Sequence, residues 1–133
     1  MNDDIEFLEL DLVLAIHARQ IERYGGAPGL RDQALLEAAV AMPASSFDGE
    51  FLHVDLFEMA AAYAFHISQN HPFFDGNKRT GLLTALTFLD TNGITLGAAS
   101  PRLFEAMMQV AEGRLSKKDL ASVFRSLARH QDS

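Results

Sequence analysis

Residues 71–81, with the sequence HPFFDGNKRTG, bring together side chains that could carry out chemistry. His71 is a candidate base, because an imidazole can accept a hydroxyl proton near neutral pH. Asp75 is a candidate metal ligand, since Mg²⁺ prefers oxygen ligands and commonly takes a carboxylate beside substrate phosphates. Lys78 and Arg79 are adjacent cations that could hold phosphate. These residue types therefore indicate chemistry on a phosphate-bearing ligand.

The same segment is expected to start a helix near Asn77 or Lys78. A helix N-terminus carries unpaired N–H groups and a partial positive charge, which together form an anion site. Gly76 lets a phosphate come close to the backbone. Lys78 and Arg79 fall in the first turn, where cations oppose the helix dipole. This unfavourable placement suits the binding of a polyanion such as a nucleotide phosphate chain.

Each element also has an ordinary interpretation. Asp-Gly-Asn alone is a common turn, and Lys-Arg alone is a solvated pair. A single histidine at a helix end is usually a cap or a surface residue, and this is what we expect of His17, His53 and His130. His66 is interpreted as a satisfied core histidine, and Phe73 is expected to pack inward. In this order, between two apolar segments, the elements of the loop are harder to explain as a turn.

Composition limits the class of protein. The chain has 133 residues and 48% apolar residues, so we expect one globular domain, residues 1–133. A net charge of −7 argues against direct nucleic-acid binding. Without cysteine, no disulfide framework is possible. The acidic start lacks a basic signal region, and no apolar run reaches the roughly 20 residues needed to span a bilayer, so a cytoplasmic protein with no membrane partner is expected.

The elements around the motif are predicted to be mostly helical. Apolar spacing predicts a first amphipathic helix from about Leu8 to Tyr24, with the glycine-rich loop YGGAPGLRD after it. Asp32 is expected to cap a short helix that ends near Val40, before Pro43. The first helix is indicated by Leu8, Leu12, Ala15, Ile16, Arg19 and Ile21.

The second half of the chain is predicted to complete the bundle. Residues 43–54 break the helical period, and Asp48-Gly49 favours a small hairpin or flap. Asp55 and Glu58 resemble a capping box before a helix that is apolar on every side and therefore central. Further helices are expected over about 77–92, 101–113 and 116–130, with Ser100 and Ser116 as N-caps. The fold class is thus all-α, a single-domain orthogonal bundle of about six helices.

The motif resembles that of the Fic/Doc family, His-x-Phe-x-(Asp/Glu)-Gly-Asn-(Gly/Lys)-Arg. Residues 71–79 match it at every position, and the segment RYGGAPGLRDQALLEAAVAMP is similar to the amino-terminal part of Doc-type toxins. The resemblance implies an enzyme that transfers part of ATP, with Mg²⁺, to a protein hydroxyl. It assigns His71 as general base and Asp75 as Mg²⁺ ligand, and the 43–54 flap would dock the target by strand addition. The nucleotide-binding residues that it implies are Phe73, Gly76, Asn77, Lys78, Arg79 and Thr80.

Two positions depart from the AMP-transferring members of the family. Those members have Gly where this chain has Lys78, and a second Arg where it has Leu82. Both features match the Doc branch, and the resemblance then implies transfer of the γ-phosphate to a threonine of a translation factor of the EF-Tu class. AMP transfer and a non-catalytic module that only binds a partner stay as alternatives.

Many family members inhibit themselves with a helix that carries Ser/Thr-x-x-x-Glu-(Gly/Asn). The nearest matches here fail, because Phe51 follows Ser46-x-x-x-Glu50, and Met108 stands four residues before Glu112. The resemblance therefore implies inhibition in trans by a cognate, Phd-like antitoxin that folds partly on binding.

Overall fold

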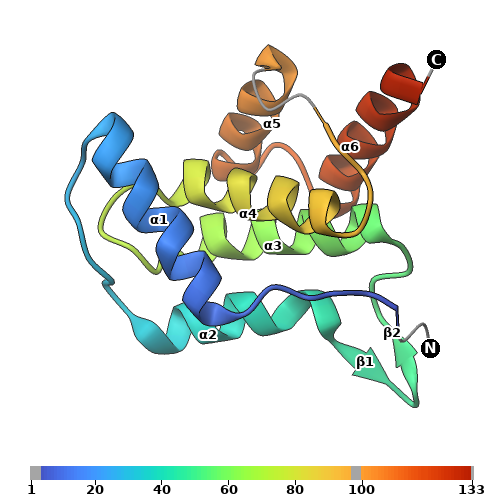
Figure 1. Ribbon diagram of the computed structural model, residues 1–133, viewed down its shortest axis with the longest axis horizontal. Helices are drawn as coiled ribbons and strands as arrows, with labels where there is room; N and C mark the ends of the chain where they lie inside the picture. The colour runs from blue at the N-terminus through green and yellow to red at the C-terminus, as the bar shows by residue number, and fades with distance from the viewer. Residues whose placement is uncertain (1–3, 97–99, 133) are drawn as a thin grey trace.

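The computed structural model describes the backbone of residues 4–96 and 100–132 and the side chains as far as Ala128. The described residues form six α-helices and one small hairpin, which confirms the all-α prediction (Figure 1). The elements are α1 Leu10–Tyr24, α2 Gln33–Ala41, a 3-10 turn Met42–Ala44, β1 Ser46–Phe47, β2 Glu50–Phe51, α3 Leu56–Asn70, α4 Asn77–Thr91, α5 Pro101–Ala111 and α6 Lys117–Asp132.

Helices α3 and α4 form an antiparallel pair at the centre of the molecule (Figure 1). α3 makes its most extensive contacts with α4, and α6 and α2 also pack on it. The pair approaches closely at Gly81, where an added Cβ would lie 2.9 Å from the backbone oxygen of Ala64. The run Ala60–Ala62 is fully buried, so small residues on α3 allow its neighbours to pack tightly. The segment between α3 and α4 carries the motif.

Local capping signals place most helix starts where the sequence predicts them. The Asp32 carboxylate accepts a hydrogen bond from the Leu35 N–H at 3.0 Å, and that of Asp55 accepts one from Glu58 at 2.8 Å. The Glu58 carboxylate accepts the N–H of Val54 at 3.3 Å, whereas in a standard capping box it would accept the N–H of the N-cap residue, Asp55. α5 begins at Pro101 as predicted, but the Ser100 side chain makes no capping hydrogen bond.

The prediction for the first helix was wrong in its start and in its buried face. The helix begins at Leu10, because Leu8 lies in an extended segment where its N–H donates to the Tyr63 hydroxyl at 2.8 Å. Leu12 is 42% exposed, and the buried residues of α1 are Val13, His17 and Gln20. Two of these three are polar, so a pattern based on apolar spacing selects the wrong side of the helix.

The predicted hairpin at Asp48-Gly49 is confirmed. Ser46 pairs with Phe51 and Phe47 with Glu50 in antiparallel register, while Asp48 and Gly49 both have positive φ. The flap is short, and it presents a large apolar side chain to solvent, since Phe47 is 76% exposed. Among the helices of the described residues, none is long and apolar enough to cross a bilayer.

Candidate active site

A pocket of about 600 Å³ opens between the motif loop, the first turn of α4 and one face of α5. Part of its lining is polar and cationic, and the rest is apolar, formed chiefly by Leu82, Phe104, Met107 and Met108. A surface of this kind can hold a ligand that has an apolar ring at one end and charge at the other. Six of the predicted site residues line it: His71, Asp75, Gly76, Asn77, Lys78 and Arg79.

The side chain of Asn77 holds the motif loop by hydrogen bonds to its backbone. Its Oδ1 accepts the N–H of Phe73 at 3.0 Å, and its Nδ2 donates to the carbonyl of the same residue at 2.9 Å. Asn77 is only 4% exposed, so these two bonds are shielded from water. Phe73 is buried, which confirms that it packs inward. The structure thus gives Asn77 a role in shaping the loop, and its predicted phosphate contact stays a prediction.

His17 supports the loop from α1, a role that we did not predict from the sequence. Its ring stacks on Phe73 with centroids 3.7 Å apart, and its Nε2 donates to the backbone oxygen of Asp75 at 2.9 Å. The expectation of a cap or surface histidine was wrong, because the side chain is 5% exposed. The i, i+4 spacing of Val13 and His17, followed by Gln20, is the signal that could have found it.

His71 stands at the C-terminus of α3, in the left-handed region, with φ 52° and ψ 53°. This conformation is rare for a residue with a side chain, so its surroundings must hold it. Arg31 does so, since its Nε donates to the His71 carbonyl at 2.7 Å and its Nη2 to that of Asn70 at 3.2 Å. The backbone N–H of Arg31 also donates to Pro72 at 2.7 Å. The imidazole itself is exposed at the pocket, where it can reach a hydroxyl group.

Asp75 is exposed, lines the same pocket as His71 and is held by the glycine-rich loop. Its Oδ2 accepts the N–H of Ala27 at 2.9 Å, and no hydrogen bond to Oδ1 occurs within the described residues. A Cβ on Gly26 would lie 3.2 Å from the Asp75 Cβ, so a larger residue would crowd the carboxylate. The described residues contain no cluster of three metal-ligating side chains. Asp75 therefore fits Mg²⁺ only as the single protein ligand of an ion that phosphates and water also hold.

The N-terminus of α4 supplies the cationic wall. Gly76 has φ 77°, and no side chain caps the helix there, so no side chain of the described residues occupies its first N–H groups. The four residues from Gly76 to Arg79 line the pocket. Lys78 and Arg79 are both exposed on this turn. Thr80 is fully buried and its Oγ1 has no partner among the described residues, so it lies behind the pocket wall, as Phe73 does. The nucleotide contacts of these two residues stay predictions.

A second polar cluster lies outside the pocket, on α3 and α6. His66 is half-buried with Nε2 3.1 Å from the Lys117 Nζ, and burial, followed by Lys117 and His53, lowers the pKa of His66 to about 4. His53 is buried, so the expectation of a surface residue was wrong, and burial is also the main cause that lowers its pKa. His66 is paired with Lys117 rather than fully enclosed. The side chain of His130 lies outside the described residues.

The chain belongs to the Fic/DOC family, whose model matches residues 7–89. The match covers α1 through most of α4 and so includes the whole motif loop and the segments that support it.

Two Doc proteins are similar to the chain. It is 36% identical over 115 residues to the protein kinase doc of Escherichia phage P1, which covers 86% of this chain and 90% of that protein. It is 43% identical over 75 residues to the toxin Doc of Mycolicibacterium smegmatis, which covers 56% of this chain and 58% of that protein. The resemblance that the motif indicated is therefore confirmed.

Proposed function

We propose that the protein is a Doc-type toxin that transfers the γ-phosphate of ATP to a hydroxyl group of a translation factor of the EF-Tu class. The observation that carries the proposal is the exposed imidazole of His71, which shares one pocket with Asp75, the open N-terminus of α4 and two cations. The name of the phage P1 relative, a protein kinase, supports the same reaction.

In the proposed reaction the target hydroxyl oxygen forms a bond to the γ-phosphorus, and the bond from that phosphorus to the bridging oxygen of ADP breaks. His71 takes the hydroxyl proton. Mg²⁺, held through Asp75, supplies charge neutralisation at the phosphates when it is bound. The α4 N-terminus with Lys78 and Arg79 binds the phosphate oxygens. Positioning and charge carry such a transfer, because phosphoryl transfer asks little covalent chemistry of the protein.

Two residues of α4 that line the pocket, Lys78 and Leu82, favour phosphate transfer over AMP transfer. Lys78 takes up space and places a charge at the start of α4. Leu82 is 2% exposed and apolar, so no cation holds phosphate at that position. AMP transfer and a non-catalytic module are the alternatives. ATP labelled at either the α- or the γ-phosphate distinguishes them, since AMP transfer would move the α label and a non-catalytic module neither.

Two partners follow from the proposal. The target docks on the flap, where the exposed edge of the hairpin and the Phe47 side chain are available for an added strand. A Phd-like antitoxin inhibits the enzyme in trans. The names of both relatives as Doc proteins, one of them a toxin, support this second partner.

The test is the incubation of purified protein with EF-Tu, ATP and Mg²⁺, followed by measurement of the intact mass of EF-Tu. We expect a gain of one phosphate with the wild type, none with His71→Ala, and a strong loss with Asp75→Asn. The control is Arg102→Ala, which changes an exposed cation on α5 outside the pocket and should leave transfer unchanged. Transfer by His71→Ala at the wild-type rate would remove the base from the mechanism.

A further inference from the structure

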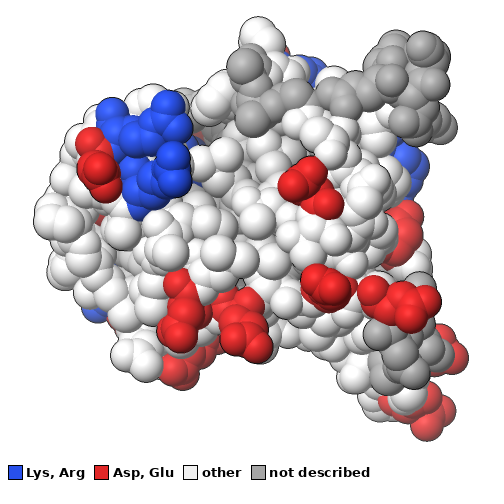
Figure 2. Space-filling model, viewed as in Figure 1, with Lys and Arg blue, Asp and Glu red and all other residues white. Residues whose placement is uncertain are grey.

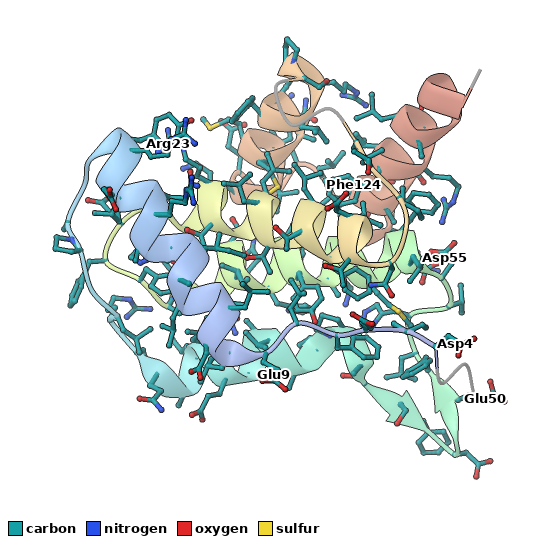
Figure 3. All side chains as sticks on the ribbon, in the orientation of Figure 1. Asp4, Glu9, Arg23, Glu50, Asp55 and Phe124 are labelled. Atoms are coloured by element: carbon teal, nitrogen blue, oxygen red, sulfur yellow. The ribbon has the colours of Figure 1, made fainter. Side chains whose placement is uncertain are left out.

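Tyr24 is the last residue of α1, and its ring contacts two guanidinium groups. The Arg79 Cζ is 4.3 Å from the ring centroid, and the Arg23 Cζ is 5.8 Å from it. Arg23 belongs to the last turn of α1 and Arg79 to the first turn of α4. Figure 3 shows Arg23 at the end of α1, beside the start of α4. The ring thus brings together two cations that are far apart in the sequence.

This cationic group makes no ion pair within the described residues. Within the part of the chain that the structure describes, no carboxylate forms an ion pair with Arg23, Lys78 or Arg79. Figure 2 shows basic side chains gathered over the end of α1 and the start of α4, with an acidic group at their edge and the other acidic side chains of that face farther away. In a chain with net charge −7, like charges held together without a partner favour an anionic ligand.

We propose that Arg23 is a further phosphate-binding residue, and that Tyr24 positions Arg79 beside it. The proposal rests on the proposed use of ATP and adds the residues that hold its outer phosphates. Arg79 lines the pocket, and the aromatic face of Tyr24 restrains its guanidinium through a cation–π contact. Arg23 does not line the pocket itself, but it contacts the same ring as Arg79, which does, so its long side chain could reach phosphates that extend out of the pocket.

The position of Arg23 has a simpler explanation, which the test must separate from ours. A cation in the last turn of a helix interacts favourably with the helix dipole. That role would affect the stability of α1 and leave nucleotide binding alone. Arg19, one turn earlier on the same helix and also exposed, provides a matched control. Among the described residues it makes no cation–π contact with Tyr24, and it does not line the pocket.

The experiment measures the binding of ATP, AMP and inorganic tripolyphosphate, each with Mg²⁺, by calorimetry in the absence of a target. Loss of one charge-assisted hydrogen bond corresponds to about a tenfold weaker affinity. We expect Arg23→Gln to weaken ATP and tripolyphosphate about tenfold and AMP less than twofold, and Arg23→Lys to restore part of the loss. Tyr24→Ala should weaken the same two ligands, Tyr24→Phe should not, and Arg19→Gln should bind like the wild type.

The outcomes are distinct. If the wild type binds ATP and Arg23→Gln binds it equally well, this inference is overturned and the proposed function stands. If Arg23→Gln weakens ATP and AMP by the same factor, Arg23 does not act on the outer phosphates and the inference is again overturned. If the wild type binds no ATP, the proposed function fails, and this inference fails with it.

Discussion

Replacing Asn77 by alanine tests whether the side chain of Asn77 stabilises the conformation of the motif loop. The change removes both hydrogen bonds between Asn77 and the backbone of Phe73, at 3.0 and 2.9 Å. It leaves a buried N–H and a buried carbonyl without a partner, because Phe73 makes no other backbone hydrogen bond among the described residues. We therefore expect the loop, and not only ligand binding, to be weakened.

The size of the effect follows from the burial of these groups. A buried polar group that loses its partner costs about 1–3 kcal/mol, so two of them should cost about 2–4 kcal/mol if the loop relaxes a little. A chain of 133 residues has an unfolding entropy of about 0.28 kcal/mol per kelvin. The melting temperature should then fall by about 7 to 14 °C.

Thermal unfolding followed by circular dichroism measures this shift, and Asn92→Ala is the matched control. The Asn92 side chain likewise hydrogen-bonds both the N–H and the carbonyl of one residue, Glu6, at 2.9 Å each. However, Asn92 lies at the far end of α4, and Glu6 is exposed. Water can replace those bonds, so a smaller shift and unchanged ATP affinity are expected. A melting temperature for Asn77→Ala that equals the wild type, together with lost ATP affinity, would refute the structural role.

Three other outcomes follow from the geometry. Gly81→Ala should lower stability by about 1–3 kcal/mol in urea unfolding, because its Cβ would meet the Ala64 oxygen at 2.9 Å, and an unchanged midpoint would contradict this. The unfolding free energy should fall as pH is lowered from 6.5 toward 4, because His66 takes up a proton in the unfolded chain but stays neutral in the folded one, where its pKa is about 4. His66→Gln should flatten this dependence on pH, and an equal slope in the variant would contradict the lowered pKa of His66. Arg31→Gln should lower kcat about tenfold and leave KM for ATP unchanged, because the His71 backbone loses a hydrogen bond that holds it. Arg31→Lys should recover part of the lost kcat, and a change in KM alone would contradict this positioning role of Arg31.

Local signals explain what the sequence could predict. The starts of α2, α3 and α4 follow from Asp32, Asp55 and Gly76, since a capping side chain or a glycine acts within a few residues. The flap follows from Asp48-Gly49 for the same reason. The site could also be located, because most of its residues are neighbours in one loop.

The supporting residues could not be predicted, because their partners are distant in the chain. His17 contacts Asp75 across 58 positions, and Arg31 contacts His71 across 40. Neither contact leaves a periodic pattern of apolar residues, and the buried face of α1 was misjudged because it is polar where it meets the loop. Thr80 directly follows the motif but is fully buried, which only the helical phase of α4 determines.

The measurement that tests the central claim most directly uses ATP labelled at either the α- or the γ-phosphate. The protein, Mg²⁺ and EF-Tu are incubated with each form, and the label on EF-Tu is compared with that in a His71→Ala reaction. The account predicts label from the γ-phosphate only, and none with the variant. Label from the α-phosphate would contradict it, since Lys78 would then permit AMP transfer, and label from neither form would favour the non-catalytic module.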